Sequence, residues 1–319
     1  MVPSAHPGTP VIKVGYLGPP GTFTEEALLA HPESPDWVPV ALPTFDDVLG
    51  AVSSGEVDRG FVAIENSIEG TVNVTIDSLI FQTDLLIQSE IILDIHLHLM
   101  AAEKLPLEKV RTVVSFPHAS AQCRGFLARE LPGVEVVAAN STADAAAHVG
   151  RDRPPATAAL APILSARLYG LEVLAHGVED HPDNQTRFVV LDRTGVPAPT
   201  GHDRTTIVCF QDADRPGNLH GILGQFAAHN INLTKLESRP TKKGLGEYCF
   251  IIDLEGHIED EVVAACLRDL HAQMDRLKFL GSYPAAGPHG PVRREEASRS
   301  WHEADEWIAA LRAQVRRLN

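Results

Sequence analysis

Side chains suited to acid–base or hydrogen-bonding chemistry gather in residues 63–71, Ala-Ile-Glu-Asn-Ser-Ile-Glu-Gly-Thr. This segment follows an expected strand and leads into an expected helix. Ligands of parallel α/β sheets bind beyond the carboxyl ends of the strands, so Glu65, Asn66, Ser67 and Thr71 are candidate site residues. A polar strand-to-helix loop that binds nothing would have the same composition, and the residues alone leave both interpretations open.

Two further segments lie at an expected strand end and an expected strand start. Residues 18–24, Gly-Pro-Pro-Gly-Thr-Phe-Thr, combine glycines with a helix N-terminus capped by Thr22. That combination suits an anion, and it equally suits a plain turn and helix cap. In residues 184–188, Asn-Gln-Thr-Arg-Phe, the Thr186 hydroxyl can donate or accept a hydrogen bond, and Arg187 could hold a carboxylate through two bonds.

Weaker candidates follow in the middle of the chain. Gln122 and Arg124 could reach a cleft from a strand-to-helix junction, whereas Cys123 has no base beside it and is not expected to be a nucleophile. His96 and His98 would share one strand face, but a metal site needs another ligand with a geometric reason. The sequence offers none, and it lacks the common nucleotide-binding and zinc-hydrolase motifs. These residues therefore support neither a metal site nor a nucleotide site.

The elements that must position these residues alternate between strands and helices. Strand patterns are expected at 11–17, 38–42, 59–64, 110–116, 134–138, 157–161 and 186–192, and helix patterns at 22–30, 44–55, 71–80, 119–130, 163–169 and from 141. Such alternation predicts βαβ units and mainly parallel sheets. Two successive sets of units predict two lobes with a cleft between them. We expect the extended stretch 85–101 to cross between the lobes and the strand at 186–192 to return.

A different pattern begins after a Pro- and Gly-rich linker at 194–204. Residues 205–284 give strand, helix, two strands, helix and strand, the βαββαβ order of a ferredoxin-like domain. Such a unit leaves strand edges to protect and often pairs with another copy. The tail, 285–319, carries one amphipathic helix pattern, which we expect to pack against its own protein or a sister subunit.

The chain is strongly acidic, with 42 Asp and Glu against 27 Lys and Arg and a net charge of −15. This charge disfavours nucleic acid and anionic membranes as general partners. An anionic substrate would need a local pocket of arginines, amides or helix N-termini. Residues 1–10 lack an apolar signal core, and no apolar run reaches the ~18 residues of a membrane helix. We therefore expect a cytoplasmic protein.

In combination and in this order, the segments resemble the prephenate dehydratase family over residues 12–284. The markers are Tyr16–Thr24, Ile64–Thr71 and Asn184–Phe188, followed by Gly217-Asn-Leu219 and Glu237-Ser-Arg-Pro240. The resemblance implies a two-lobed, periplasmic-binding-protein-like catalytic domain at 11–193, with one lobe at about 11–88 plus 180–193 and the other at about 89–179. It also implies a regulatory ACT domain at 205–284. The implied reaction removes water and carbon dioxide from prephenate to give phenylpyruvate. Because that chemistry needs neither, we expect no metal and no organic cofactor.

The resemblance also implies residue roles. Thr186 would be the key catalytic hydroxyl, in the same cleft as Glu65, Asn66, Ser67, Thr71 and Gln122. Of these, Glu65, Asn66 and Gln122 are further catalytic candidates. Our own inference, from the chemistry of a buried carboxyl beside a dianion, makes Glu65 the candidate proton donor. The candidate substrate-binding residues are Thr22, Ser67, Thr71, Arg187 and Phe188. The roles of Arg187 and of the helix N-termini at Thr22 and Thr71 are our own inference, because they could neutralise the substrate carboxylates. Phenylalanine, the expected feedback effector, would bind between paired ACT domains of a homodimer or homotetramer. Its expected contacts are Gly217, Asn218, Leu219, Glu237, Ser238, Arg239 and Pro240.

Two departures and several alternatives accompany this interpretation. Residues 115–118 are Ser-Phe-Pro-His where relatives more often have Ser-His-Pro-Gln, and Asn218 stands where alanine is usual. Arogenate dehydratase would have the same chemistry on an aminated substrate. A non-catalytic binding module would use the same two-lobed architecture. A degenerate regulatory subunit is disfavoured because the Thr186-Arg-Phe motif is intact.

Overall fold

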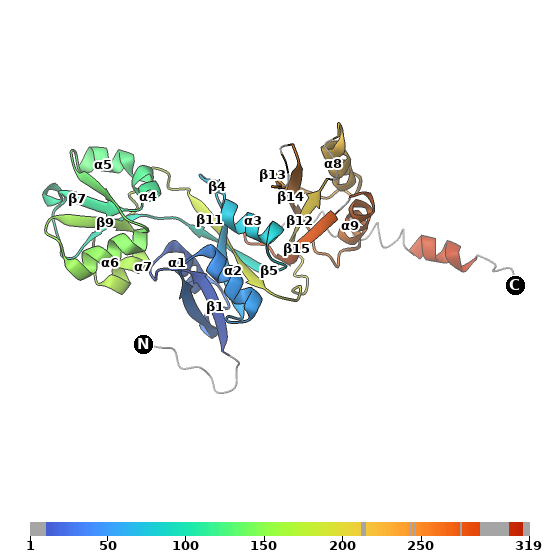
Figure 1. The fold of residues 1–319 in the computed structure, drawn as a ribbon, viewed down its shortest axis with the longest axis horizontal. Helices are drawn as coiled ribbons and strands as arrows, with labels where there is room; N and C mark the ends of the chain where they lie inside the picture. Colours follow the sequence, from blue (N-terminus) through green and yellow to red (C-terminus); the bar gives the residue numbers. More distant parts are fainter. Residues whose placement is uncertain are drawn as a thin grey trace. The chain divides into compact units, whose positions relative to one another are not determined.

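The computed structural model describes residues 11–211, 215–242, 244, 246–274, 276–287 and 306–314. The described residues form two compact units (Figure 1). One unit runs through Thr83 and includes Ile91–Arg193, and the other comprises Asp84–Glu90 and the residues from Thr194 onward. Each unit is described by itself below.

The first lobe of the first unit is built on a six-stranded sheet with the order β2-β1-β3-β11-β5, in which β4 also pairs with β3. Its strands are β1 (Ile12–Leu17), β2 (Trp37–Leu42), β3 (Arg59–Asn66), β4 (Gly70–Thr71), β5 (Leu86–Asp94) and β11 (Gln185–Asp192). Its helices are α1 (Phe23–Ala30), α2 (Phe45–Ser54) and α3 (Asn73–Phe81), with a short 3-10 turn, η1, at Ser34–Asp36. The expected caps are confirmed, because Thr22 and Thr44 accept hydrogen bonds from the backbone of Glu25 and Asp47.

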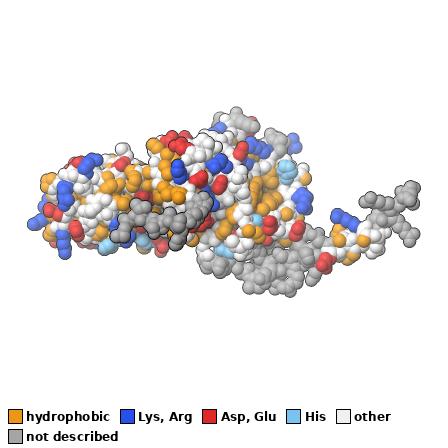
Figure 2. All heavy atoms as spheres, turned by 90° about the horizontal axis from the view of Figure 1, so that it is seen from below, with side chains coloured by type: hydrophobic (Ala, Val, Ile, Leu, Met, Phe, Trp, Pro, Cys, Tyr) orange, Lys and Arg blue, Asp and Glu red, His pale blue; other side chains and the backbone are white. Residues whose placement is uncertain are grey.

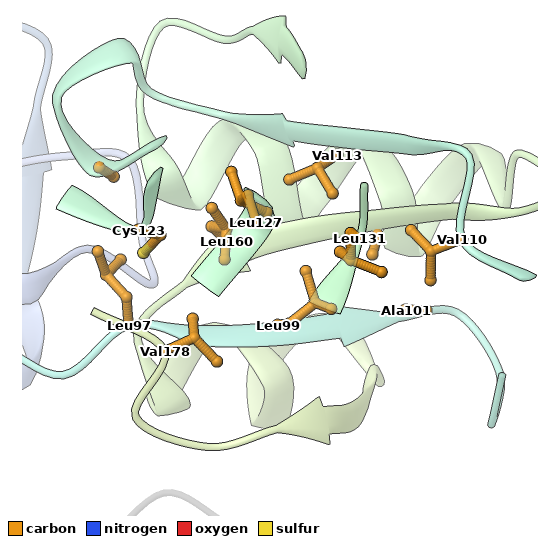
Figure 3. Close-up of a cluster of buried hydrophobic side chains, with 12 residues drawn as sticks. Leu97, Leu99, Ala101, Val110, Val113, Cys123, Leu127, Leu131, Leu160 and Val178 are labelled. Carbon is orange, nitrogen blue, oxygen red and sulfur yellow. The ribbon is translucent and has the colours of Figure 1, made fainter. Parts of the chain in front are cut away.

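The second lobe carries a five-stranded sheet with the order β10-β6-β9-β7-β8. Its strands are β6 (His98–Ala101), β7 (Thr112–Ser115), β8 (Glu135–Ala138), β9 (Thr157–Ala161) and β10 (Glu172–Ala175). Its helices are η2 (Leu107–Lys109), α4 (Pro117–Gln122), α5 (Arg124–Glu130), α6 (Thr142–Asp152) and α7 (Ile163–Tyr169). Leu97, Leu99, Val113, Leu127 and Leu160 meet in its core (Figure 3).

The two-lobed prediction is confirmed, but the sheets are mixed rather than mainly parallel. β1 runs parallel to β2 and β3, whereas the returning strand β11 runs antiparallel to β3. In the second lobe, β7 runs parallel to β8 and β9, and β6 runs antiparallel to β9 and β10. Of the antiparallel strands, β11 and β6 each follow a lobe crossing and enter their sheets without the crossover helix that makes neighbours parallel. The short strand β4 instead returns to β3 through a tight turn.

Several expected boundaries differ from the structure. The helix expected from Thr71 begins at Asn73, because Gly70 adopts a positive φ of 79° and Thr71 pairs with Glu65 as part of β4. The helix expected at 119–130 is divided at Cys123 into α4 and α5. Strand β10 was not expected. β5 extends to Asp94 in the first sheet, so the outward crossing lies at 95–97, later than the predicted boundary near 88.

The crossing segments at 95–97 and 176–184 are tied to each other. The Glu179 carboxylate contacts Nδ1 of His96 and accepts from the backbone of Leu97, both at 2.8 Å. The backbone of Ile95 donates to the Asn184 carbonyl at 2.7 Å. Any change in the relation of the two lobes must therefore move both crossings together.

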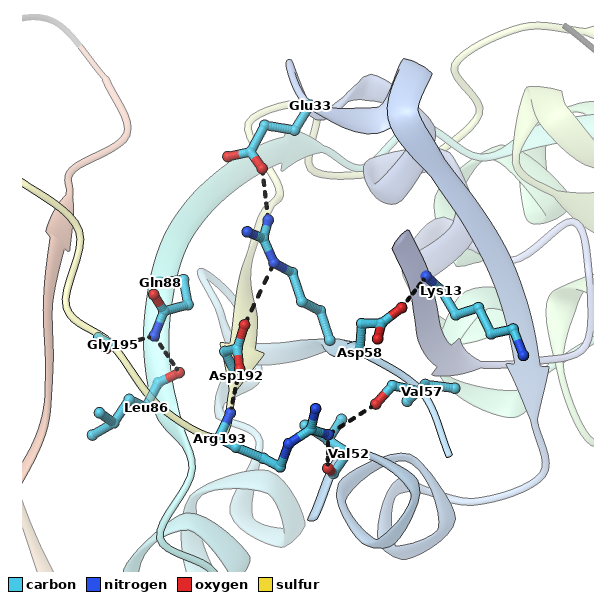
Figure 4. Close-up of polar contacts among 11 residues, drawn as sticks. Lys13, Glu33, Val52, Val57, Asp58, Leu86, Gln88, Asp192, Arg193 and Gly195 are labelled. Atoms are coloured by element: carbon cyan, nitrogen blue, oxygen red, sulfur yellow. Dashed lines mark hydrogen bonds and ion pairs between the residues drawn. The ribbon is translucent and has the colours of Figure 1, made fainter. Parts of the chain in front are cut away.

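The far end of β11 is fixed to the first lobe by two arginines (Figure 4). Arg193 donates to the carbonyls of Val52 and Val57 at 2.6 and 3.1 Å. Arg59 pairs with Glu33 at 2.6 Å and with Asp192 at 3.6 Å. These contacts fix the C-terminal end of β11. Its N-terminal end carries Thr186.

The second unit has the predicted ferredoxin-like order. Its four-stranded sheet runs β13-β14-β12-β15. The elements are β12 (Asp203–Phe210), α8 (Asn218–Ala228), β13 (Leu233–Pro240), β14 (Tyr248–Glu255), α9 (Glu261–Gln273) and β15 (Arg276–Pro284). β12 thus begins two residues inside the predicted linker. Glu90, whose side chain is 0% exposed, pairs with Arg204 at 2.8 Å within this unit.

Part of the predicted tail helix is described. Residues 306–313 are helical, and Trp307 and Leu311 are 63% and 42% exposed. Residues 288–305 and 315–319 of the tail lie outside the described residues. Among the described helices, none combines the length and apolar character needed to cross a membrane. On the face in Figure 2, the described acidic and basic side chains are interspersed, without a broad basic area.

Candidate functional site

The two polar motifs of the first lobe meet where β3 ends and β11 begins. In their antiparallel pairing, Thr186 lies opposite Asn66 and Arg187 lies opposite Glu65. A bulge then shifts the register between Arg187 and Phe188. Bulges often occur beside active sites, where they redirect side chains. Segments about 120 residues apart in sequence therefore contribute neighbouring side chains.

The Asn66 side chain determines which hydrogen bonds the Thr186 hydroxyl can make. Its Oδ1 accepts from the backbone amides of Ile68 and Glu69, each at 2.9 Å. Since those groups can only donate, the other atom must be Nδ2, which donates to Oγ1 of Thr186 at 2.9 Å. Thr186 is 9% exposed. With a lone pair already engaged, its own O–H is the part that can donate to a ligand.

Ser67 and Asn184 extend this group toward the second lobe. Ser67 Oγ accepts from the Gln185 amide at 2.9 Å and donates to Oδ1 of Asn184 at 3.3 Å. Asn184 in turn donates from Nδ2 to Oε1 of Gln122, on α4, at 3.4 Å. The expected residues Asn66, Ser67, Thr186 and Gln122 are therefore close together. Asn184 stood in the sequence motif without an assigned role, and only its buried position, 2% exposed, indicates one.

Glu65, Arg187 and Thr71 form a second group. Arg187 Nη1 lies 3.4 Å from Oε2 of Glu65, with side chains 8% and 35% exposed, and Thr71 pairs with Glu65 through β4. Successive side chains of a strand point to opposite faces, so this group lies on the other face of the sheet from Thr186 and Asn66. The sequence-based expectation that Glu65 and Thr186 share one surface differs from this arrangement.

Phe188 and Thr22 are engaged elsewhere. Phe188 is 2% exposed and stacks on Phe61 with ring centroids 5.5 Å apart, so its ring packs in the core, and its contact with substrate stays a prediction. The Thr22 hydroxyl donates to the Leu17 carbonyl at 3.5 Å, and the carboxylate of Glu25 accepts from the Gly21 amide at 2.5 Å. The first turn of α1 is thus already served by its own side chains.

The glycine-rich loop before α1 contacts the second lobe. Ser165 and Tyr169 of α7 donate to the carbonyls of Gly21 and Pro20 at 2.7 and 2.5 Å. Gly21 has φ 93°, and a Cβ there would meet the Ser165 hydroxyl at 2.8 Å. A glycine is therefore required both by the backbone conformation and by the close approach of the lobes.

Residues 117–124, which form α4 and the start of α5, differ in what they contact. His118 Nδ1 lies 3.4 Å from a carboxylate oxygen of Glu69, joining α4 to the β3–β4 turn of the other lobe. Burial raises the pKa of the Cys123 thiol to about 12, which agrees with the expectation that it is no nucleophile. Arg124 lines a separate surface hollow of about 380 Å³ with Pro117 and Leu127. No group of His, Cys, Asp and Glu suited to a metal occurs within the described ranges.

In the second unit, the two expected effector segments lie at the same end of the sheet. β12 and β13 both run antiparallel to β14, so they run parallel to each other. Gly217, with φ 90°, caps α8 after the end of β12, and residues 237–240 form the end of β13. Glu237 lies between Lys235 and Arg239, 3.6 Å from each. β13 is an edge strand, and its outer edge could pair with another chain.

Both units of the chain match models of known protein families. A family model for prephenate dehydratase matches residues 14–195. The chain belongs to the prephenate dehydratase family. An ACT-domain model matches residues 205–272. A prephenate dehydratase of Mycolicibacterium vanbaalenii is 41% identical over 313 residues, which cover 94% of this chain and 98% of the relative.

Two solved structures extend the comparison. Prephenate dehydratase of Arthrobacter aurescens in complex with L-Phe is 37% identical, with a TM-score of 0.86, over 94% of this chain and 99% of that one. A structure described as GqqA, a quorum quenching acylase, is 30% identical, with a TM-score of 0.78, over 86% and 98%. The 41% and 37% identical relatives are named prephenate dehydratases, whereas the 30% identical structure carries a different activity name.

Proposed function

We propose that this chain converts prephenate to phenylpyruvate, with release of carbon dioxide and water. The observation that carries the proposal is the Asn66–Thr186 pair, which presents a hydroxyl donor beside the boundary between the lobes. The name of the 41% identical relative supports the same reaction. Both prephenate and arogenate have the ring hydroxyl and ring carboxylate that this chemistry requires.

The reaction would need little covalent help from the protein. The bond to the ring carboxylate breaks and its electron pair enters the ring, while the carbon–oxygen bond to the ring hydroxyl breaks. Aromatisation drives both changes, and hydroxide must leave with a proton or a strong hydrogen bond. Thr186 would donate to that departing oxygen. A threonine hydroxyl is a very weak acid, so its main effect would be to stabilise developing negative charge.

The remaining residues would bind and orient the dianion. Gln122 and Ser67 are proposed to line the same side as Thr186 and Asn66. Arg187 would supply positive charge close to the site, with Thr71 and Glu65 fixing its position. Because Thr22 already caps α1, we propose that it supports the loop conformation and leave substrate contact to the other residues.

Glu65→Gln tests whether Glu65 is the proton donor. Its partner Arg187 gives Glu65 the role of a counter-ion, so we expect kcat/KM to fall by about tenfold or less and the acidic limb of the pH profile to persist. Steady-state rates from pH 5 to 9 would measure this. Glu69→Gln, which changes a 49% exposed carboxylate in the same segment, is the matched control. Loss of the acidic limb in Glu65→Gln alone would show that Glu65 is the acid.

Phenylalanine is proposed as the allosteric effector at the ACT domain, between two copies of the chain. The support is the L-Phe complex of the Arthrobacter relative and the common location of the Gly217–Leu219 and Glu237–Pro240 segments. Phenylalanine titration of the initial rate, with light scattering in parallel, tests both parts. A folded, active protein that stays monomeric and ignores phenylalanine would contradict them.

Incubation of the purified protein with prephenate, with arogenate in parallel, tests the reaction itself. Phenylpyruvate absorbance at alkaline pH would support the proposal. Turnover of arogenate alone would keep the site and change the substrate. Binding of prephenate without turnover of either compound would indicate a non-catalytic binding module.

A further inference from the structure

The direction of each hydrogen bond around Asn184 is fixed by backbone groups. The amides of Ile68 and Glu69 determine that Asn66 presents Nδ2 to its neighbours. Nδ2 of Asn66 donates to Asn184 at 2.8 Å, so the accepting atom of Asn184 must be its oxygen. Ser67 donates to the same oxygen, because an amide oxygen can only accept and the Ser67 hydroxyl carries the hydrogen.

A hydrogen bond between Asn184 and Gln122 extends this fixed pattern of donors and acceptors to the second lobe. With its oxygen used as an acceptor, Asn184 has only Nδ2 to offer Gln122, and it donates to Oε1 across 3.4 Å. That distance is long for an amide hydrogen bond, and the two amides belong to different lobes, so lobe closure would shorten it. The Oε1 atom of Gln122 is thereby engaged, and the Nε2 group is left as a pure donor.

Asn184 is well placed to impose this orientation. It is 2% exposed, so its amide cannot turn to water. Its backbone carbonyl accepts from Ile95 in the other crossing segment at 2.7 Å. A rotation of the side chain would leave the donors of Asn66 and Ser67 facing another donor, and a buried polar group without a partner is unfavourable.

We propose that Asn184 is a positioning residue, which orients Gln122 so that its Nε2 group donates to a carboxylate of the bound substrate. This inference rests on the proposed function. The Thr186 hydroxyl from one lobe and the Gln122 amide from the other then act as two preset donors. If residue 184 offered only an acceptor, Gln122 would turn its amide to satisfy it and present Oε1 to an anion.

Asn184→Asp makes that change with almost no change in shape. The carboxylate still accepts from Asn66 and Ser67, but when ionised it has no donor for Gln122. We expect KM for prephenate to rise about ten- to a hundredfold above the parent value near pH 8, since a hydrogen bond to a charged group is lost. At lower pH the protonated carboxyl can donate to Oε1 again, so the ratio of variant to parent KM should fall toward one.

The KM ratio from pH 5 to 8 separates positioning from general damage. Thermal unfolding of both proteins would show whether the fold is kept. Gln82→Glu, an exposed amide-to-carboxyl change at the end of α3, is the matched control and should follow the parent at every pH. A KM ratio near one throughout, or a raised ratio that does not change with pH, would overturn the inference.

A second variant keeps the inference testable if Asn184→Asp does not fold. Gln122→Glu leaves Asn184 its acceptor and removes the same donor from the cleft, so KM should rise to a similar extent; an unchanged KM would contradict the proposal. The activity of the parent protein separates failure of the proposed function from failure of the proposed role of Asn184. If it does not convert prephenate, the proposed function fails, whereas a working parent with unaffected variants removes only the role of Asn184.

Discussion

Thr186→Val is expected to lower kcat for phenylpyruvate formation by about a hundred- to a thousandfold, the effect of removing one preorganised donor from developing negative charge. Valine matches threonine in shape, and the Asn66 amide keeps acceptors in Asn184 and the Gln185 carbonyl. KM should change little, because a donor to the leaving oxygen gains strength mainly in the transition state. Stopped assays of phenylpyruvate over a range of prephenate concentrations measure both constants.

Thr186→Ser is the matched control, since it retains the hydroxyl and loses only a methyl group. The kcat of Thr186→Ser should stay within about tenfold of the parent value. The loss in Thr186→Val should also occur without a large change in melting temperature. A valine variant that stays within tenfold of the parent in kcat would remove Thr186 from the mechanism, whatever the identity of the substrate.

Phe188→Ala is expected to destabilise the first unit by about 3–5 kcal/mol, the usual cost of deleting a buried aromatic ring. Phe188 is 2% exposed and stacks on Phe61 at 5.5 Å in the core beneath β3 and β11. The ring lies on the same face of β11 as Thr186, two residues away, so the site should also lose activity as the strand loosens. Urea unfolding followed by fluorescence or circular dichroism measures the change.

Phe116→Ala provides the comparison, because Phe116 is 38% exposed and its removal should cost about 0.5 kcal/mol or less. Both variants lose the same side chain, so the difference between them isolates burial. If Phe188→Ala proved as stable as Phe116→Ala, the role of Phe188 in the core would be wrong.

Much of the local structure could be predicted from sequence because its causes are local. Thr22, Thr44 and Ser141 start helices where their hydroxyls meet amides three residues later, and Gly170 ends α7 with φ 63°. The βαββαβ order followed from the same signals. The sequence pattern predicts Thr71 in a helix, because a helix-like pattern does not reveal the positive φ of Gly70. That φ turns the chain back, so that Thr71 pairs with β3.

The pairing of distant strands could not be predicted in the same way. Residues 188–191, Phe-Val-Val-Leu, are apolar without alternation, so they do not show which face carries Thr186 and which carries Arg187. Only the register of β11 against β3 places Glu65 and Thr186 on different faces. Asn184 remained without a role because its importance lies in contacts with residues 62 and 118 positions away in the sequence.

The position of β11 between β3 and β5 determines when each lobe can be completed on the ribosome. Every strand of the second lobe lies within residues 98–175, so that lobe can fold as soon as this continuous stretch has emerged. The first lobe must wait for residues 185–192, and until then β3 and β5 have unpaired edges that invite aggregation. A nascent chain stalled after residues up to about 180 have emerged from the ribosome should therefore contain a protease-resistant second lobe beside a protease-sensitive first lobe.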